Sequence, residues 1–195
     1  MDSNDQQYLD RVLEVTRRYV STSVKMSNDM HEYQNSLELE KIFDPSVLLN
    51  PVERSQFRDK LKKLVAMFDG YKKYYQTYVV NLTRDMLVIH SELPPEQQKE
   101  VTERFMASVQ ARISEQSCFY TLRQRWVDAV YALLDLMDSS KDCYFDGQSY
   151  CFDKDTDIER FNTIMQEIND VSEMEQKIQQ ARMERVGKNM NILGS

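Results

Sequence analysis

The stretch FRDKLKKLVAMFDGYKKYYQTYVVNLTRDMLVI, residues 57–89, decides the fold class of this 195-residue chain. Its apolar residues recur at steps of three and four, a heptad pattern with one stutter. This spacing puts them on one stripe of a single long α-helix. Gly70 lies inside that helix at a cost of about 1 kcal/mol, which we interpret as a mark of close approach by another helix. The stripe, here called the central seam, comprises Phe57, Leu61, Leu64, Phe68, Tyr71, Tyr75, Tyr78, Leu82, Met86 and Ile89.

Three other parts of the chain show apolar residues at the same helical spacing. The breaks between these parts contain proline, at Asp44-Pro45, Asn50-Pro51 and Pro94-Pro95. Proline fits the first turn of a helix but not its interior, so the breaks mark where helices begin and end. The predicted helices are about residues 5–42, 51–91, 95–138 and 156–187.

The predicted helices determine the expected architecture. Each would be roughly 45–65 Å long, and none can bury its apolar stripe alone. The connections between them are short, which favours antiparallel neighbours. We therefore expect an all-α fold: one domain over residues 1–195, built as an elongated antiparallel up-down-up-down four-helix bundle. The alternative is a pair of long helical hairpins that forms a homodimer.

Composition supports a helical class. The chain has 4 Gly and 4 Pro, about 2% each, whereas average proteins have roughly 7% and 5%. So few turn-forming residues cannot punctuate a many-stranded barrel or sandwich, or supply the loops of a doubly wound sheet. With 41% hydrophobic residues, the chain can build a substantial core, which excludes wholesale disorder.

Residues 139–155, SSKDCYFDGQSYCFDKD, depart from helical spacing and predict a small β-hairpin-like tip between the third and fourth helices. Aromatic residues flank an Asp-Gly dipeptide, which is a hairpin signal. A three-residue turn would place Cys143 opposite Cys151, where a cross-strand disulfide is geometrically feasible. A two-residue turn would instead pair Cys143 with Tyr150. The sequence leaves both registers open, and the disulfide with them.

Charge and hydropathy set the expected compartment. The formal net charge is −7 and the isoelectric point is near 5.0, which argues against nucleic-acid binding. No stretch approaches the roughly 18 apolar residues that span a bilayer, so no membrane span is expected. The N-terminus lacks the basic and apolar regions of a signal peptide. We expect a cytoplasmic protein if Met1 is the native start, and a periplasmic or secreted one otherwise.

Common catalytic and metal-binding patterns are missing from the sequence. His31 and His90 lack the glutamate three residues earlier that a di-iron bundle needs. Cys143 and Cys151 have no nearby histidine to complete a zinc site. The glycine-rich phosphate loops and the nucleophile elbow of hydrolases are also absent. We therefore expect no metal, no cofactor and no catalytic residues, and hence not an enzyme.

The first functional hypothesis is a non-enzymatic protein-interaction module: a helical adaptor, a chaperone-like binder or an inhibitor. An acidic surface favours a basic protein partner, because complementary charge speeds association. Aromatic residues are enriched at binding hot spots, so the aromatic residues of the tip are the candidate contacts. The alternative for these residues is that they cover the open end of the bundle. The candidates are Tyr144, Phe145, Tyr150 and Phe152.

The second hypothesis is a bundle that senses a small ligand or a lipid. Gln116 and Arg123 fall at positions of the third helix where the spacing predicts apolar residues. A buried arginine can bind an anionic ligand, and Trp126 lies one turn further along. The alternative for Arg123 is that its guanidinium extends outward from the edge of the core.

Overall fold

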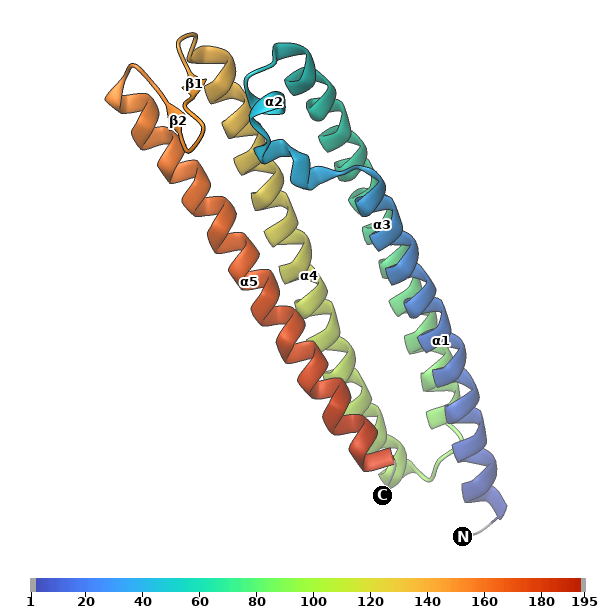
Figure 1. Ribbon diagram of the computed structural model, residues 1–195. Helices are drawn as coiled ribbons and strands as arrows, with labels where there is room; N and C mark the ends of the chain where they lie inside the picture. Colours follow the sequence, from blue (N-terminus) through green and yellow to red (C-terminus); the bar gives the residue numbers. More distant parts are fainter. Residues whose placement is uncertain (1–2, 194–195) are drawn as a thin grey trace. The chain divides into compact units, whose positions relative to one another are not determined.

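In a computed structural model, the backbone is described over residues 3–193 and the side chains over residues 6–181 (Figure 1). The predicted helical class is confirmed, with a small antiparallel two-stranded sheet added between the last two helices. Among the described residues, no helix combines the length and apolarity needed to cross a bilayer. The elements are α1 (Ser3–Ser36), the 3-10 helix η1 (Leu39–Phe43), α2 (Pro45–Leu48), α3 (Pro51–His90), α4 (Pro95–Ser139), β1 (Tyr144–Phe145), β2 (Tyr150–Cys151) and α5 (Asp155–Leu193).

The chain divides into two compact units, each assembled from separate segments. Unit 1 joins the residues up to Leu39 with Lys63–Ser117, so it contains α1, most of α3 and the first half of α4. Unit 2 joins Glu40–Lys62 with the residues from Cys118 onward. Helices α3 and α4 therefore each contribute to both units.

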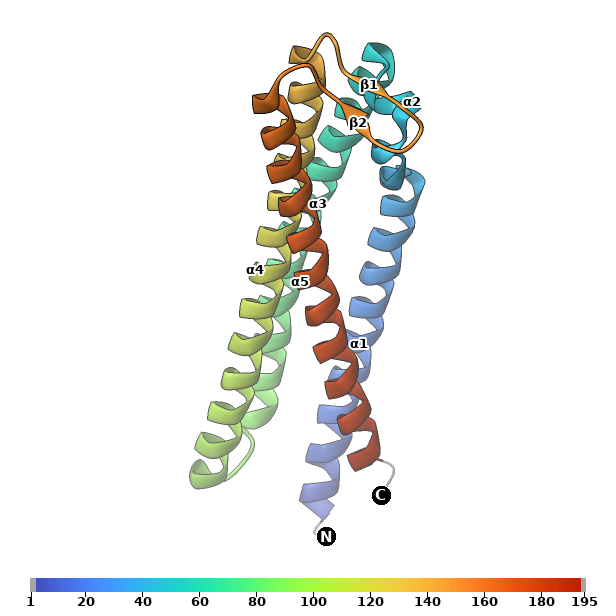
Figure 2. The ribbon, with the colours of Figure 1, turned by 60° about the vertical axis from the view of Figure 1, so that its left-hand side comes forward.

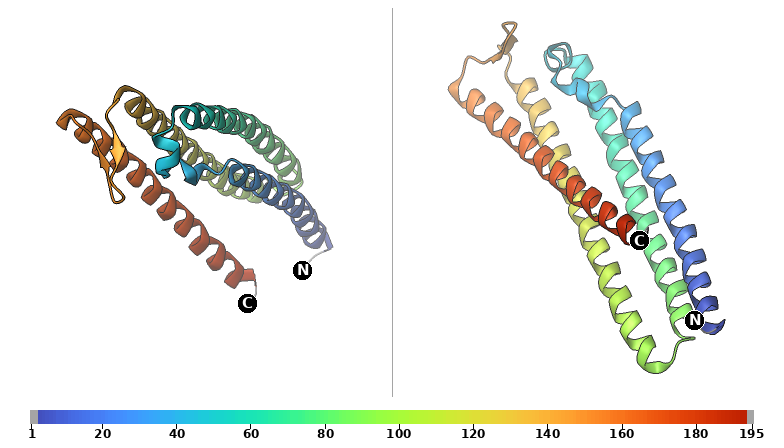
Figure 3. Two further views of the ribbon diagram at one scale, coloured as in Figure 1. Left: turned by 45° about the horizontal axis from the view of Figure 1, so that its top comes forward. Right: turned by 60° about the horizontal axis from the view of Figure 1, so that its bottom comes forward.

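In unit 1, α1 packs against α3 in antiparallel orientation (Figure 3). Arg11 forms an ion pair with Glu92, just after α3, and Arg18 Nη2 lies 2.6 Å from Asp85 Oδ2 of α3. The later residue of α1 thus pairs with the earlier partner, as in an antiparallel pair. The Tyr19 hydroxyl donates to the same Asp85 carboxylate at 2.8 Å. Within residues 6–36, every side chain is half-buried or exposed, so α1 is held by polar and partly covered contacts.

Helix α4 turns back along α3 after the connection at residues 91–94. The buried ring of His90 meets Phe105 edge-on at 5.4 Å, and its Nδ1 lies 3.3 Å from Thr102 Oγ1. Burial lowers the pKa of His90, which favours the neutral ring. The end of α3 and the start of α4 are thereby joined through an uncharged histidine.

Unit 2 contains the larger set of fully buried side chains. Helices α4 and α5 run antiparallel: the Ser140 hydroxyl lies 2.9 Å from Asp157 Oδ2, and Arg125 donates to both oxygens of Glu167 at 2.8 and 3.1 Å. Its buried apolar residues include Ile42, Leu48, Phe57, Leu61, Val127, Val130, Leu133, Leu134, Leu136, Met137, Phe152, Ile168 and Val171.

The first helix ends earlier than predicted. The helix was predicted to end at about residue 42, but α1 ends at Ser36, and Glu38 has a left-handed φ of 51°. The chain then turns inward to bury Ile42 and Leu48 completely. Both residues belong to the core of unit 2, so the chain after α1 serves that core instead of extending the helix.

The prediction for Gly70 is also wrong. A Cβ atom added at Gly70 would meet nothing within 4 Å, so no neighbouring helix approaches it closely. The glycine faces open space.

Asp85 makes the α1–α3 contact pH-dependent. The Tyr19 hydrogen bond is the main cause that lowers the pKa of Asp85, assisted by Arg84 and Arg18. The carboxylate therefore stabilises the fold above its unfolded-state pKa, and this stabilisation is lost as the pH falls through the folded-state pKa. We expect the melting temperature of the Asp85→Asn variant, followed by circular dichroism, to fall less than that of the wild type between about pH 5 and 2. Parallel curves for the two proteins would contradict this role.

Candidate functional site

The four aromatic residues of the tip differ in exposure, and most of them face the protein. The Tyr144 side chain is 55% exposed, whereas Phe152 is buried and Phe145 and Tyr150 are half-buried. Ring centroids lie 5.2 Å apart between Phe145 and Tyr150, and 5.5 Å between Tyr150 and Phe161 of α5. Phe152 contacts the same Phe161 ring at 5.4 Å. Tyr150 and Phe152 thus pack against Phe161 of α5, Phe145 packs against Tyr150, and Tyr144 is the exposed ring of the four.

Tyr150 also fastens the hairpin to η1, which lies beside it (Figure 2). Its hydroxyl donates to the carbonyl oxygen of Phe43 at 3.3 Å. Burial, with the nearby Asp44 carboxylate and Cys143 thiol, raises the pKa of Tyr150 to about 12. The phenol therefore keeps the proton that it donates at any physiological pH.

Both predicted hairpin registers are wrong. Tyr144 pairs with Cys151 and Phe145 with Tyr150, which leaves four residues in the turn. The Asp146 side chain explains the longer turn, because its Oδ1 accepts the backbone N–H groups of residues 148 and 149 at 2.8 Å each. Cys151 therefore does not lie opposite Cys143.

The three cysteines are not joined to one another in the structure. Cys118, Cys143 and Cys151 are all free there, and the Cys143–Cys151 disulfide considered from the sequence is not among its bonds. Burial is the main cause that raises the pKa of Cys143, and the neighbouring Cys151 adds to it. A thiol with a raised pKa is a weak nucleophile at neutral pH, because the thiolate is the reactive form.

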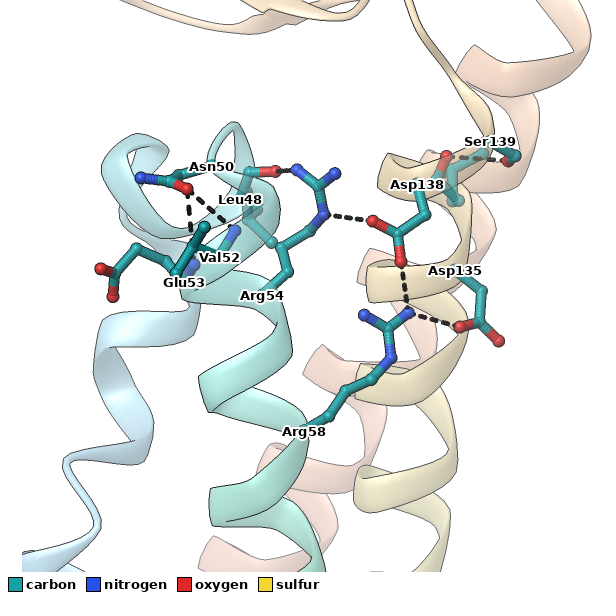
Figure 4. Close-up of polar contacts among 10 residues, drawn as sticks. Leu48, Asn50, Val52, Glu53, Arg54, Arg58, Asp135, Asp138 and Ser139 are labelled. Atoms are coloured by element: carbon teal, nitrogen blue, oxygen red, sulfur yellow. Dashed lines mark hydrogen bonds and ion pairs between the residues drawn. The ribbon is translucent and has the colours of Figure 1, made fainter.

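A polar network joins the start of α3 to the end of α4 in unit 2 (Figure 4). Arg54 is only 6% exposed; its Nε donates to Asp138 Oδ1 at 2.7 Å, and its Nη1 donates to the Leu48 carbonyl at 2.5 Å. Arg58 Nη2 contacts Asp135 at 2.6 Å and the second Asp138 oxygen at 2.8 Å. Arg54 thus ties three segments together: α2, α3 and α4.

The residues that begin α3 determine where the two arginines of this network lie. Asn50 begins α3 by accepting the backbone N–H of Val52 at 2.9 Å, with Pro51 at the first helical position. Arg54 follows on the first turn and Arg58 on the second, so both point along the same face. This arginine pair is not among the residues predicted from the sequence. An arginine pair spaced by four residues opposite Asp135 and Asp138, which are spaced by three, is the signal that could have found it.

The three residues of the ligand hypothesis lie on α4. Gln116 is half-buried in unit 1, whereas Arg123 and Trp126 are half-buried in unit 2. Arg123 Nε lies 3.0 Å from Glu175 Oε1 of α5, and neither atom is reached by solvent or has hydrogen-bonding geometry. The chain's own carboxylate thus lies where that hypothesis needs an anionic ligand.

Burial opposes the charges of this pair. Desolvation lowers the pKa of Arg123 and raises that of Glu175, while the attraction between them works against both shifts. The Arg123 guanidinium also lies over the Phe119 ring at 5.3 Å. A buried ion pair of this kind adds little to the free energy of unfolding. Any register of α4 and α5 that separated the two side chains would leave a buried charge without a partner, so the pair favours the observed register.

Unit 1 has an apolar groove that sequence analysis did not predict. It runs along α3 and α4, encloses about 640 Å³ and has Arg84 as its one charged lining residue among the described side chains. Val80 is 65% exposed and Val88 is 55% exposed. Other exposed apolar side chains in this α3–α4 groove are Leu87, Met106 and Ile113.

The signal for this groove is a doubled apolar pattern. Val79-Val80 and Leu87-Val88 each place two apolar residues side by side, and the central seam uses none of these four. Successive helical residues are 100° apart, so such pairs put apolar atoms on a second face.

The described residues contain no group of three or more His, Cys, Asp or Glu side chains arranged to hold a metal ion. No protein-family model matches the sequence, and no match was found among curated proteins or solved structures.

The Arg54 network gives a stability prediction. Replacing Arg54 with Met would leave the Leu48 carbonyl without its donor and remove the contact with Asp138. We expect a loss of about 2–3 kcal/mol in the free energy of unfolding, measured by urea denaturation. The matched control is Asp135→Asn, since this carboxylate is 68% exposed and Arg58 keeps its contact with Asp138. We expect little change in the control, and equal losses in both variants would refute the assignment.

Proposed function

We propose that the protein is a non-enzymatic protein-interaction module that binds its partner through the α3–α4 groove of unit 1. The observation that carries this proposal is the exposure of Val80 and Val88 beside a groove with an apolar lining. Exposed apolar patches of this kind are costly in water and mark interaction surfaces. The tip aromatics support the proposal less, because three of the four pack against other aromatic rings of unit 2.

The groove suits an amphipathic helix of a partner protein. Two antiparallel helices form its walls, and on each helix exposed apolar side chains recur after about two turns, which matches the apolar stripe of a third helix. Val80 and Val88 are eight residues apart on α3, and Met106 and Ile113 are seven apart on α4.

Charge supports a basic partner. The chain carries −7, so a basic protein would be drawn to it from a distance, and its association would slow as salt is added. Inside the groove, Arg84 is the charged residue, and it lies 3.3 Å from Asp85. The partner's binding face would therefore be apolar, with its basic residues outside the contact.

The groove proposal is tested with a matched pair of double variants. The partner is first identified by native mass spectrometry of the complex and then purified. We expect Val80→Glu/Val88→Glu to weaken binding at least about 100-fold, because charges would be buried at the centre of the contact. Val20→Glu/Val24→Glu, on equally exposed valines of α1, serves as the control and should bind like the wild type.

Three outcomes would count against the groove. One is equal affinity of the two double variants, and another is loss of binding only in Tyr144→Ser, which would return the contact to the tip. The third is a partner that proves to be a second copy of this chain, recognised by light scattering as a homodimer.

We also propose that the two units belong to one up-down-up-down four-helix bundle. The support lies in the contacts inside each unit, where α1 with α3, α3 with α4, and α4 with α5 are all antiparallel. A closed bundle needs one more contact, between α1 and α5.

Spin-label distances test the closed bundle. If the antiparallel registers are continued, Val24 and Ala181 lie at the same level on neighbouring helices. In a variant with its three cysteines replaced by serine, labels at these two positions are expected one helix spacing apart, about 10 Å between axes. A long or broad distribution would contradict the closed bundle while leaving the groove proposal standing.

A further inference from the structure

A second hollow lies within unit 1, between α1 and α3, and is called here the Gly70 hollow. It encloses about 670 Å³, within the roughly 300–1,000 Å³ typical of small-molecule sites. It is separate from the α3–α4 groove, with which it shares no lining residue.

Gly70 keeps this space open. Glycine is unfavourable in the interior of a helix, yet α3 has one here, on a face where an added Cβ would meet nothing within 4 Å. Neither close helix packing nor a positive φ explains it, since the residue is helical and open to space. Any larger side chain at this position would project into the hollow.

Two opposite charges lie on the α1 wall. Lys25 and Asp29 are one helical turn apart and exposed, and neither forms an ion pair with another described side chain. Nearer the start of α1, Arg11 pairs with Glu92, which follows α3, and Arg18 pairs with Asp85 of α3. The ion pairs that hold α1 against α3 therefore do not involve Lys25 and Asp29, and both side chains can bind a ligand.

The rest of the wall combines the polar side chains of Ser21 and Thr22 with apolar and aromatic ones. Met26 and Met67 provide adaptable thioether side chains, and Tyr71 and Tyr74 provide ring faces. The Asp29 carboxylate acts on the Tyr71 hydroxyl, whose pKa is raised by burial first and by Asp29 second. The negative charge thus lies near an aromatic ring, as in sites that recognise ammonium groups.

We propose that the Gly70 hollow binds a small zwitterion with an apolar side group, of the class of the large apolar α-amino acids. Its carboxylate would pair with Lys25, its ammonium with Asp29 and the Tyr71 ring, and its side group would lie on Met26 and Met67. The site is independent of the protein-binding groove, so either can fail without the other.

Three probes test the two charges. Binding to the full-length protein is measured by isothermal titration calorimetry with L-phenylalanine, phenethylamine and 3-phenylpropionate, which carry both charges, only the ammonium and only the carboxylate. We expect L-phenylalanine to bind about tenfold more tightly than either single-charge probe. Lys25→Gln should weaken L-phenylalanine about fivefold but leave phenethylamine unchanged. Asp29→Asn should weaken L-phenylalanine and leave 3-phenylpropionate unchanged.

Two substitutions at Gly70 test the hollow itself. Gly70→Leu fills it with a good helix former and should lower the affinity for L-phenylalanine by at least about tenfold. Gly70→Ala is the matched control: it should keep wild-type affinity and raise the melting temperature, because alanine favours the helix and has room here. Circular dichroism checks that both variants remain helical.

The proposal is overturned if the wild type gives no binding heat with L-phenylalanine, or if Gly70→Leu binds it as tightly as Gly70→Ala does. Equal affinity for L-phenylalanine and phenethylamine would overturn the zwitterion assignment.

Discussion

Burial of the central seam of α3 is the constraint on which the rest of the structure depends. A 40-residue helix with apolar residues along its whole length cannot remain alone in water, so other segments must cover it. The seam is buried near its two ends, at Phe57, Leu61 and Leu64 and again at Met86 and Ile89. Its tyrosine-rich middle is only half-buried.

Tyrosine tolerates this intermediate position because its ring is apolar and its hydroxyl can find a partner. The Tyr78 hydroxyl donates to the Tyr19 carbonyl oxygen at 3.1 Å, and the two rings meet edge-on at 5.3 Å. A leucine in that place would need deeper cover than α1 provides. The residue types along the seam thus follow the degree of burial, with tyrosines in the half-buried middle.

Much of the helical structure could be predicted because it follows from spacing and caps, which are local. The start of α3 at Pro51 and of α4 at Pro95 follows from proline at a first helical turn. The end of α1 could not be predicted, since it depends on burial of Ile42 and Leu48 against residues far along the chain. The division into two units has no signal in the spacing, because the seam continues unchanged through residue 62.

The candidate sites were harder to predict than the helices. The hairpin register depends on one side-chain acceptor, Asp146, which lengthens the turn beyond both options considered. Arg123 was identified as unusual, but its partner Glu175 lies 52 residues later, and spacing cannot reveal that contact. The α3–α4 groove and the Gly70 hollow exist because no other segment covers these helix faces. Which faces stay uncovered depends on tertiary packing, and residue spacing does not predict it.

The partly covered character of α1 has a consequence for the order in which the molecule comes apart. None of its side chains over residues 6–36 is fully buried, whereas unit 2 contains a dense set of fully buried residues. Local opening has a low free energy where few apolar contacts must be broken. We therefore expect helix α1 to detach at a lower free energy than the core of unit 2 unfolds. Such an opening would expose Tyr78, whose ring packs against Tyr19 of α1, while the core of unit 2 stays folded.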